Sequence, residues 1–375
     1  MSAVRNALVI GGGFSGTSAA IQLRKAGIDV DLVEIDPGWR SYGAGITLNG
    51  ATLRALDMVG VLPEVMTHGA CTDGAEIYTA DGHKLGELNS PRLGGQHVPS
   101  GGGIMRPVLA KILSEATRRS GTRVRLGCHA TSIDQRESAV DVSFSDGAQG
   151  SYELIVAADG ARSAIRETFF PAAPKPSYTG QGVWRAVVPR PKEVACPSFY
   201  MGPRLKAGVN PVSQTSMYLF LTEDRPVNEH VPQEELLPQL LALLDHFAAP
   251  IPQYVRSVLN ADSHIVYRPL EALLMPEPWY QGRVVLIGDA AHASTPHLAA
   301  GAGMGVEDAV VLAEELHRAS SLPQALGAFQ QRRFPRCRLV VENSVRLGRI
   351  EQTGGSQQEH ADIMRTSAIA LAGPF

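Results

Sequence analysis

The stretch from residue 4 to residue 34 constrains the fold more than any other part of the chain. Residues 4–10 (VRNALVI) read as an apolar strand, and the glycine-rich run GGGFSG follows at once at 11–16. Residues 17–26 (TSAAIQLRKA) read as a helix, and residues 28–33 form a second apolar strand that ends on Glu34. A strand, a glycine turn, a helix and a second strand in this order predict a βαβ unit of an α/β fold.

The glycine spacing fits G-x-G-x-x-G, and each glycine has a physical reason. Gly11 permits a tight turn, Gly13 lets the backbone approach a pyrophosphate, and Gly16 lets helix and strand pack closely. The free N–H groups at the helix start bind phosphate, and Glu34 can accept hydrogen bonds from a ribose diol. We predict a dinucleotide site here. An acid at position 34 argues against a ribose 2′-phosphate, and the unit alone does not separate NAD from FAD.

The bulk composition narrows the class of protein. A length of 375 residues suggests two domains, and 44% hydrophobic with 19% charged residues is typical of a soluble globular protein. A net charge of −3 favours neither nucleic acid nor an anionic membrane as a partner, and no apolar run reaches spanning length. The strand at residue 4 leaves no room for a cleavable signal, so we expect a cytoplasmic protein. We expect it to be a monomer or a homodimer. Four scattered cysteines without a C-x-x-C indicate free thiols and no metal site: Cys71, Cys128, Cys196 and Cys337.

The middle of the chain has the pattern of a second domain. Residues 75–79 and 84–88 read as strands joined by the hairpin signal Asp81-Gly82. Further strands at 183–188, 198–201 and 217–222 precede an apolar helix, which predicts a sheet with a covering helix. The segments 73–99 and 177–264 are assigned to this substrate domain, and 1–72, 100–176 and 265–375 to the dinucleotide domain with C-terminal helices.

Two more stretches run from an apolar strand directly into an acid. Residues 154–158 lead into Asp159, which serves either as a ligand at the sheet edge or as a helix N-cap. Residues 283–287 lead into Gly288-Asp289, and the glycine-rich run 301–305 then opens a helix with Glu307 and Asp308 expected in its first turn. The arginines of the following long helix are interpreted as a solvated face: Arg332, Arg333, Arg336 and Arg338.

Together these motifs resemble those of class A FAD-dependent monooxygenases, the family of p-hydroxybenzoate hydroxylase and salicylate hydroxylase. The matching pieces are GGGFSG with Glu34, then Arg106, AADGARSAIR, and GDAAHASTPHLAAGAGMGVEDA, in the family's order. The resemblance implies a Rossmann-like FAD-binding domain, an inserted sheet-plus-helix substrate domain and a C-terminal helical segment. It further implies that NADH or NADPH reduces FAD and that a flavin C4a-hydroperoxide formed with dioxygen hydroxylates a small aromatic substrate, which is a phenol, an aromatic acid or an N-heteroaromatic compound.

By the same resemblance, a set of residues is expected to contact FAD. They are Gly11, Gly13, Phe14, Ser15, Gly16, Glu34, Arg40, Arg106, Asp159, Asp289, Pro296, Gly301, Ala302, Gly303 and Met304. Ala302 and Met304 stand where the family often has Gln and Asn, so only backbone contacts to the flavin are expected there. A helix N-terminus at this point would stabilise the negative charge of reduced flavin.

The substrate side offers four candidates for catalysis: Arg185, Tyr218, Pro296 and His297. Arg185 could pair with a substrate carboxylate, contact FAD or form a surface ion pair, and Tyr218 could bond a hydroxyl or fill a core. His297 could accept a phenol proton, since an ordinary pKa of about 6.5 suits that task, or could only pack. By resemblance, Thr47 and Asn49 lie near the flavin edge, and His292 is interpreted as structural.

Alternative functions on the same sequence differ in substrate or in chemistry. One alternative is a hydroxylase or epoxidase of the same fold that acts on a larger, non-benzenoid natural product. Another is a non-catalytic FAD-binding protein, against which the intact stretch from Gly288 to Gly305 argues. A flavin halogenase is disfavoured because the chain has no W-x-W-x-I-P segment.

Overall fold

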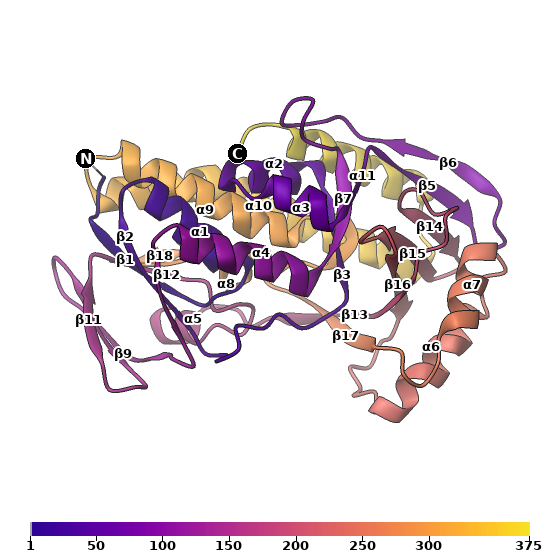
Figure 1. Ribbon diagram of the computed structural model, residues 1–375, viewed down its shortest axis with the longest axis horizontal. Helices are drawn as coiled ribbons and strands as arrows, with labels where there is room; N and C mark the ends of the chain where they lie inside the picture. The colour runs from indigo at the N-terminus through magenta and orange to yellow at the C-terminus, as the bar shows by residue number, and fades with distance from the viewer. Residues whose placement is uncertain (1) are drawn as a thin grey trace.

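The glycine-rich unit forms the centre of a six-stranded sheet in the computed structural model, which describes residues 2–375 (Figure 1). Strand β1 (Asn6–Ile10), helix α1 (Phe14–Lys25) and strand β2 (Asp29–Glu34) follow each other as the sequence predicts. Strand β1 pairs in parallel with β2 on one side and with β12 (Leu154–Ala157) on the other. The glycine turn therefore opens at the carboxyl edge of the two central strands, where α/β sheets bind ligands.

The remaining strands extend this sheet in the order β18-β19-β12-β1-β2-β8. The outer strands are β8 (Arg123–Leu126), β18 (Tyr280–Gln281) and β19 (Val284–Leu286). Central residues such as Leu8, Ile155 and Val285 are fully buried, because helices cover both faces of a parallel sheet. A small antiparallel sheet of β9 (Ala130–Gln135), β10 (Val140–Phe144) and β11 (Gln149–Tyr152) precedes β12.

A second sheet of seven strands stands at the other end of the molecule, in the order β17-β13-β16-β15-β14-β5-β6 (Figure 1). Its strands are β5 (Gly74–Thr79), β6 (Lys84–Asn89), β13 (Ser177–Pro189), β14 (Ser198–Gly202), β15 (Leu205–Pro211), β16 (Ser216–Asp224) and β17 (Ile265–Ala272). The predicted hairpin of β5 and β6 is confirmed as an antiparallel pair. The division of the chain into two domains at 73–99 and 177–264 stays a prediction, and the paired sheet itself continues through β17 to Ala272.

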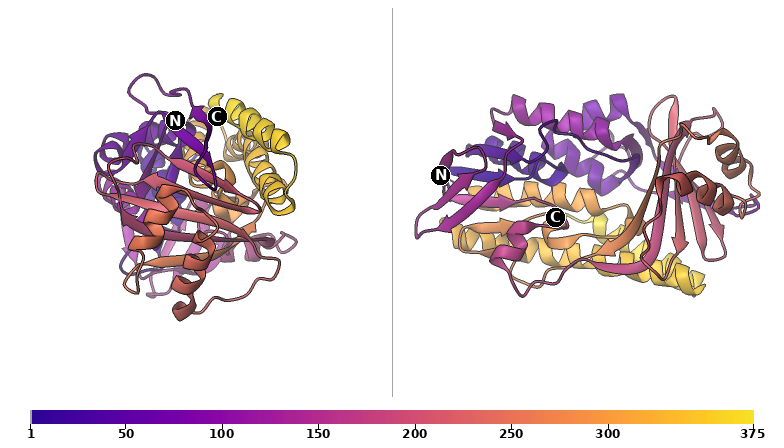
Figure 2. Two further views of the ribbon diagram at one scale, coloured as in Figure 1. Left: turned by 90° about the vertical axis from the view of Figure 1, so that its right-hand side faces the viewer. Right: turned by 90° about the horizontal axis from the view of Figure 1, so that it is seen from below.

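The two faces of the seven-stranded sheet differ. One face carries Trp184, Leu219 and Leu221, which are fully buried in one apolar cluster with residues of helices α6 and α7. The covering helices are η1 (Gln233–Glu235), α6 (Leu236–Leu244) and α7 (Pro250–Val258). Because side chains alternate along a strand, Arg185, Tyr218 and Phe220 lie on the opposite face. Figure 2 shows this sheet between α6 and α7 on one side and the dinucleotide domain on the other.

A three-stranded sheet and three helices connect the two larger sheets, in the upper and middle part of Figure 1. The strands are β3 (Gly45–Asn49), β4 (Ala70–Thr72) and β7 (Gly101–Met105), and the helices are α2 (Gly50–Val59), α3 (Leu62–His68) and α4 (Arg106–Arg119). Strand β7 brings Gly103 against β15 of the seven-stranded sheet, where an added Cβ would overlap the Pro211 carbonyl oxygen. The glycines of β7 thus permit close approach of the two parts of the protein.

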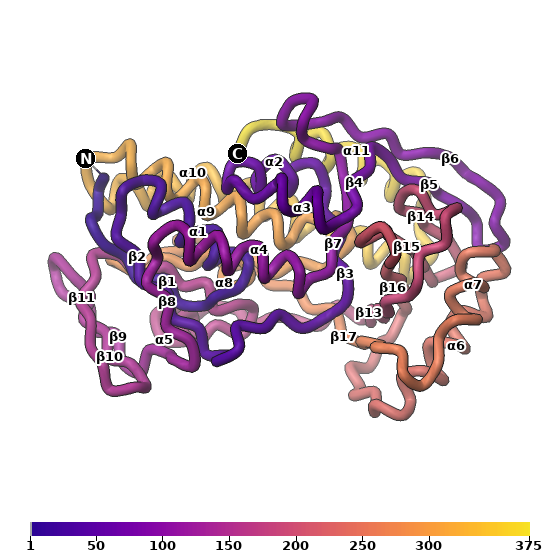
Figure 3. Tube along the Cα trace, viewed as in Figure 1, coloured from indigo at the N-terminus to yellow at the C-terminus, as the bar shows by residue number. Residues whose placement is uncertain are grey.

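The C-terminal segments run the length of the molecule. They are α8 (Asp289–His292), η2 (Pro296–Leu298), α9 (Gly301–Arg318), α10 (Leu322–Thr353) and α11 (Gln357–Ala372). The short helix α5 (Ala164–Phe169) follows β12 earlier in the chain. Helix α9 packs on α1, and α10 packs on α9 and η2 and reaches β13. Figure 3 traces this arrangement, with the orange C-terminal helices beside the indigo N-terminal unit. Within residues 2–375, no helix has both the length and the apolar character that crossing a bilayer requires.

Candidate active site

Three glycine-containing segments that are far apart in the sequence meet at Ser15. A Cβ added at Gly288 or at Gly305 would overlap the Ser15 hydroxyl. Ser15 belongs to the first turn of α1, Gly288 to the loop after β19, and Gly305 to the start of α9. The first glycine motif and the two C-terminal motifs therefore build one site, as the family resemblance implies.

Within the first motif, Gly16 and Gly13 have different surroundings. A Cβ at Gly16 would overlap the carbonyl oxygen of Gly11, so Gly16 serves close packing of helix and turn. A Cβ at Gly13 would meet nothing within 4 Å, and Gly13 is exposed. The turn thus leaves open space beside the N-terminus of α1, which fits a pyrophosphate bound by its free N–H groups.

Glu34 already accepts two backbone hydrogen bonds. Its carboxylate accepts from the N–H of Gly12 at 2.7 Å and from the N–H of Asp36 at 2.8 Å. The Trp39 indole donates to the Gly12 carbonyl at 2.8 Å, so the acid and the indole fix the first turn from both sides. Carboxylate oxygens have further lone pairs, so this arrangement still fits a ribose diol.

Arg40 lies at the outer side of the same region. It is exposed, bonds Asp36 and stacks over the ring of Tyr42 at 5.5 Å. A pocket of about 480 Å³ lies between residues 38–42 and the side chains of α4, among them Lys111. It lies next to the turn that Glu34 fixes, so it fits an adenosine end better than a flavin ring.

Arg106, Phe14 and Asp289 lie together on the other side of the glycine turn. The Arg106 guanidinium lies 5.2 Å from the centre of the Phe14 ring, and burial lowers the pKa of Arg106 although Asp289 opposes that shift. The Asp289 side chain is exposed, but the protein around it desolvates the carboxyl and raises its pKa, against the effects of His292 and Arg106. Neither side chain bonds to another residue in the described range 2–375, so both are free to bind a ligand.

Asp159 combines features of the two roles considered for it, a ligand-binding acid at the sheet edge and a helix N-cap. Its Oδ2 accepts a hydrogen bond from the Ile165 N–H at 3.2 Å, while the N-cap of α5 is Ser163, which accepts from the Arg166 N–H at 2.9 Å. The Asp159 Oδ1 atom is buried and has no hydrogen-bond partner within residues 2–375, and burial raises the pKa of the acid. One oxygen thus supports the helix start and the other remains for a ligand.

The start of α9 differs from the sequence prediction. The helix begins at Gly301, so Glu307 and Asp308 lie in its second turn, and the prediction that they occupy the first turn is wrong. No side chain caps the N-terminus of α9, so no capping group accepts hydrogen bonds from the N–H groups of its first turn. Pro296, in the η2 turn just before it, is exposed. The N–H groups of Gly301, Ala302 and Gly303 therefore remain free within residues 2–375, next to an accessible surface. The Met304 N–H donates to the Ala300 carbonyl at 2.9 Å, so the expected backbone contact from Met304 to the flavin is wrong.

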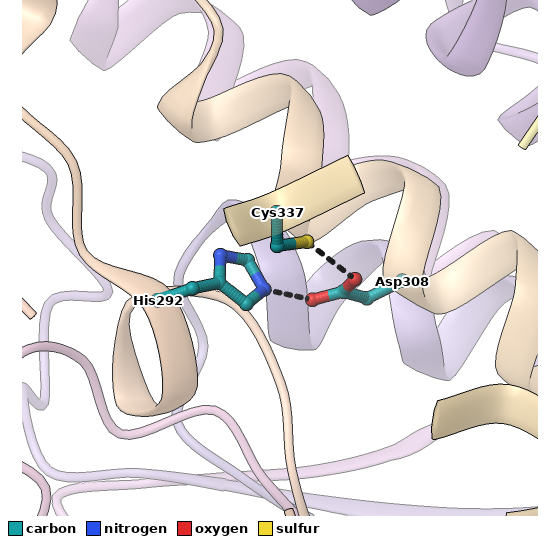
Figure 4. A group of neighbouring side chains, drawn as sticks. All are labelled: His292, Asp308 and Cys337. Carbon is teal, nitrogen blue, oxygen red and sulfur yellow. Dashed lines mark hydrogen bonds and ion pairs between the residues drawn. The ribbon is translucent and has the colours of Figure 1, made fainter. Parts of the chain in front are cut away.

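The acids of this second turn belong to a buried ionic network (Figure 4). Asp308 accepts from the Gly288 N–H at 2.8 Å, from Arg333 Nε at 2.7 Å, and lies 2.6 Å from His292 Nε2. Burial acts to raise the pKa of Asp308, but His292 and Arg333 outweigh it and lower the pKa to about 2. Asp308 thus fastens the loop that carries Asp289 to helices α9 and α10.

Arg333 corrects the interpretation of the arginine run as a solvated face. Its side chain is fully buried and also donates to Glu307 at 2.8 Å, which Arg336 pairs from the other side at 2.7 Å. Arg332 pairs with Glu314 and Glu315, and only Arg338 fits the solvated interpretation. A signal was present, because Arg333 falls in phase with the buried Phe329 and Cys337, four residues away on either side.

The same network includes three residue types that commonly coordinate metal ions, His292, Asp308 and Cys337. Their potential metal-coordinating atoms lie within 4.8 Å of one another. The Arg333 guanidinium bonds Asp308 and lies 3.5 Å from the Cys337 sulfur. A cation at this point would be repelled by the guanidinium, so the cluster is an ionic support. Although burial acts against protonation, Cys337 and Asp308 raise the pKa of His292 well above its ordinary value.

On the substrate side, Tyr218 and Arg185 come together near Arg106. The Tyr218 hydroxyl lies 2.5 Å from the Thr47 hydroxyl, to which Asn210 donates at 3.0 Å. The Tyr218 ring lies so close to Gly45 that a Cβ there would overlap it. Burial raises the pKa of Tyr218 and lowers that of Arg185. Arg185 forms no ion pair within residues 2–375, and it is a desolvated cation next to a phenol hydroxyl.

His297 lies in a different environment. Its Nδ1 lies 2.9 Å from the Thr295 hydroxyl and its Nε2 lies 3.4 Å from Glu351, and only 1% of the side chain is exposed. Burial lowers the pKa of His297 although Glu351 opposes the shift. Glu351 also pairs with Lys206 at 2.5 Å, across 145 residues of sequence. Sequence reasoning missed Lys206, Glu351 and Asn210, none of which belongs to a motif.

Asn49 connects the substrate side to the η2 turn. Its side chain caps α2 by accepting from the Thr52 N–H at 2.9 Å, and its amide donates to the Leu298 carbonyl at 3.4 Å. Thr47 and Asn49 are thus adjacent members of β3 that reach Tyr218 and η2, respectively. The strand β3 therefore holds the two sides of the site at a fixed separation.

The fold and this site define a class of flavoprotein, and the chain belongs to it. Residues 5–344 match the family described as FAD binding domain, and relatives include 3-hydroxybenzoate 6-hydroxylase of Polaromonas naphthalenivorans, 27% identical over 94% of this chain and 89% of that protein. The chain is an FAD-dependent monooxygenase of the class A aromatic hydroxylase family, which confirms the resemblance seen in the sequence.

Individual relatives and structures are similar to most of the chain. The 2-heptyl-3-hydroxy-4(1H)-quinolone synthase of Pseudomonas aeruginosa (strain UCBPP-PA14) is 34% identical, covering 92% of this chain and 89% of that protein. The crystal structure of Klebsiella pneumoniae HpxO complexed with FAD and uric acid has a TM-score of 0.86 at 23% identity, covering 99% of this chain and 97% of that chain. This likeness confirms the predicted fold class.

Proposed function

We propose that the protein uses NADH or NADPH and dioxygen to hydroxylate an electron-rich aromatic ring, and that Tyr218 and Arg185 bind this ring. The observation that carries the proposal is the juxtaposition of a buried phenol hydroxyl with an unpaired, desolvated cation beside Arg106. A phenolate or carboxylate on the substrate would satisfy Arg185, because a desolvated guanidinium binds an anion strongly.

FAD supplies the reduction of dioxygen when it is bound, and the protein's residues provide its site. Asp289 and Arg106, which lack protein partners within residues 2–375, are assigned to the polar chain of the cofactor. The unpaired N–H groups at Gly301, Ala302 and Gly303 are assigned to the flavin ring, with Pro296 beside it. A helix N-terminus there favours negative charge on the ring without a mobile cation.

The substrate hydroxyl is assigned to Tyr218. The Thr47 hydroxyl accepts from Asn210 and can donate to Tyr218, so the Tyr218 hydroxyl can donate to a phenolate oxygen. Arg185 then lowers the cost of holding that phenolate negative, and a phenolate ring is the better nucleophile. His297 has both ring nitrogens beside protein groups, so we assign it to holding the η2 turn rather than to direct proton transfer.

The printed names of the relatives support a ring substrate. They include hydroxybenzoate, hydroxynicotinate, urate and quinolone enzymes, and all of these names describe aromatic or heteroaromatic compounds. Sequence identities of 26–34% to these relatives do not identify the particular aromatic ring that this protein hydroxylates, and the residues of its own site must select that ring.

The test is a screen of phenols, aromatic acids and hydroxylated N-heterocycles with the FAD-loaded protein. We expect at least one ring to stimulate NAD(P)H oxidation and dioxygen uptake, with product formed in proportion. Tyr218→Phe should lower the product per NAD(P)H and raise peroxide, while FAD content stays unchanged. Tyr254→Phe, which alters an exposed hydroxyl on α7, is the matched control. Absence of any ring-stimulated NAD(P)H oxidation would overturn the proposal.

A further inference from the structure

One cross-strand row on the open face of the seven-stranded sheet begins at Arg185. Arg185 lies opposite Phe220, Phe220 opposite Gly208, Gly208 opposite Phe199, and Phe199 opposite Ile77. Residues directly opposite each other share a face of the sheet. The five residues therefore form one continuous row across five strands, which we call the aromatic row.

The side chains of the aromatic row contact each other and remain accessible. The Phe220 ring centre lies 5.9 Å from that of Phe199 and 6.0 Å from that of Tyr218. A Cβ at Gly208 would overlap the Phe220 ring, so the ring lies flat across the sheet at that glycine. Phe199, Phe220 and Ile77 are half-buried, whereas the residues of the helix-covered face are fully buried. Apolar surface is thus left uncovered beside the proposed ring site.

On its middle strand, β15, the aromatic row has a polar group on each side. Asn210 and Lys206 lie on β15 two residues after and two residues before Gly208, on the same face of the sheet. Asn210 is hydrogen-bonded to Thr47, and Lys206 is paired with Glu351. The apolar strip is one residue wide at β15, and Met201 on β14 and Ala75 on β5 widen it toward Ile77. From Phe220 to Ile77 it crosses three strand spacings, which is roughly 14 Å. An apolar strip of this length that narrows at β15 suits a flexible chain of methylene groups.

We propose that the aromatic row binds an aliphatic chain attached to the substrate ring, so that the substrate class is an alkyl-substituted hydroxyaromatic compound. The ring lies at Tyr218 and Arg185, and the chain extends over Phe220 and Phe199 toward Ile77. This inference rests on the proposed function for the position of the ring. It goes beyond it by naming the substituent that the ring carries.

The test uses phenol, 4-propylphenol and 4-heptylphenol as probes of the FAD-loaded protein, with the change in flavin absorbance as the measure of binding. Each added methylene should tighten binding about fourfold, which corresponds to about 0.8 kcal/mol of burial, until the chain passes the end of the row. Phe199→Ala should reduce this gain for 4-heptylphenol and leave the affinity for phenol unchanged. Ile77→Ala, at the far end, should leave all three affinities unchanged, because an extended seven-carbon chain is shorter than the row and ends before Ile77.

Ile369→Ala is the matched control, because Ile369 is 63% exposed on α11 and lies outside the sheet. Binding of phenol without any gain for longer chains would overturn the aromatic row as a chain site and leave the proposed function intact. Failure of all three phenols to perturb the flavin would overturn the placement of the ring at Tyr218, and this inference with it.

Discussion

Replacing Arg333 with methionine should destabilise the protein severely, although Arg333 touches no expected ligand. Arg333 is fully buried and joins Asp308, Glu307 and the Met304 carbonyl, so its removal takes one cation from between two buried acids. Glu307 keeps Arg336, and Asp308 keeps His292 and the Gly288 N–H. Each acid thus keeps one cationic partner, and the loss is that of the two charge-assisted hydrogen bonds from Arg333 to Asp308 and Glu307, which contribute about 1.5–3 kcal/mol each.

Such a loss is a large part of the free energy of unfolding of a typical domain, which is about 5–15 kcal/mol. The assay is urea unfolding of the FAD-loaded protein, followed by circular dichroism and by flavin fluorescence. Arg338→Met is the matched control: Arg338 pairs with Glu342 on the surface of the same helix, and its loss should cost about 0.5 kcal/mol or less.

Arg333→Lys separates charge from geometry. Lysine keeps the cation but lacks the planar fork that bonds two carboxylates and a carbonyl at once, so an intermediate loss is expected. If Arg333→Met unfolds within about 1 kcal/mol of Arg338→Met, the network does not stabilise the site as described.

Three further predictions concern the cofactor site and its pH dependence. Gly13→Val should fold normally, because its side chain would enter open space, but the purified protein should lack the visible absorbance of FAD; full flavin occupancy would refute the pyrophosphate placement. Asp289→Ala should weaken FAD binding about 10- to 150-fold, the loss of one hydrogen bond to a charged group, measured by equilibrium dialysis, and an unchanged affinity would remove Asp289 from the site. The pKa of Asp308 is lowered to about 2 from an ordinary 3.8, so its ionised form stabilises the fold above pH 4 and this stability is lost as the pH falls toward 2. Between pH 4 and pH 2 the wild-type protein should lose about 2 kcal/mol of unfolding free energy through protonation of Asp308, and Asp308→Asn should not show this loss. Equal slopes of unfolding free energy against pH in the wild type and the variant would contradict the assignment.

The parts of the site that sequence predicted are those fixed by local backbone geometry. Gly11 and Gly288 in their turns and Gly16 in the first turn of α1 stand where a side chain would overlap the backbone or Ser15, and such requirements restrict the residue type at each position. The acids Asp159 and Asp289 follow apolar strands, so the sheet edge locates them without knowledge of the tertiary structure.

The rest depended on contacts between distant segments. Arg333 belongs to a run of arginines on a long helix, and only the packing of α10 on α9 decides which of them is buried. Lys206 and Glu351 meet because α10 reaches the seven-stranded sheet, and no local pattern encodes that distance. The start of α9 was misplaced for a similar reason, since glycines at 301, 303 and 305 are weak helix formers that tertiary packing overrides.

The meeting of three segments at Ser15 sets the order in which the protein can mature during synthesis. Roughly 300 residues separate Ser15 from Gly305, and a ribosome adds about 5–20 residues per second, so the last wall of the cofactor site emerges roughly 15–60 s after the first. Strand β19 also joins the central sheet only then. A nascent chain can form the βαβ unit early, but it can retain its cofactor only after α9 has left the ribosome.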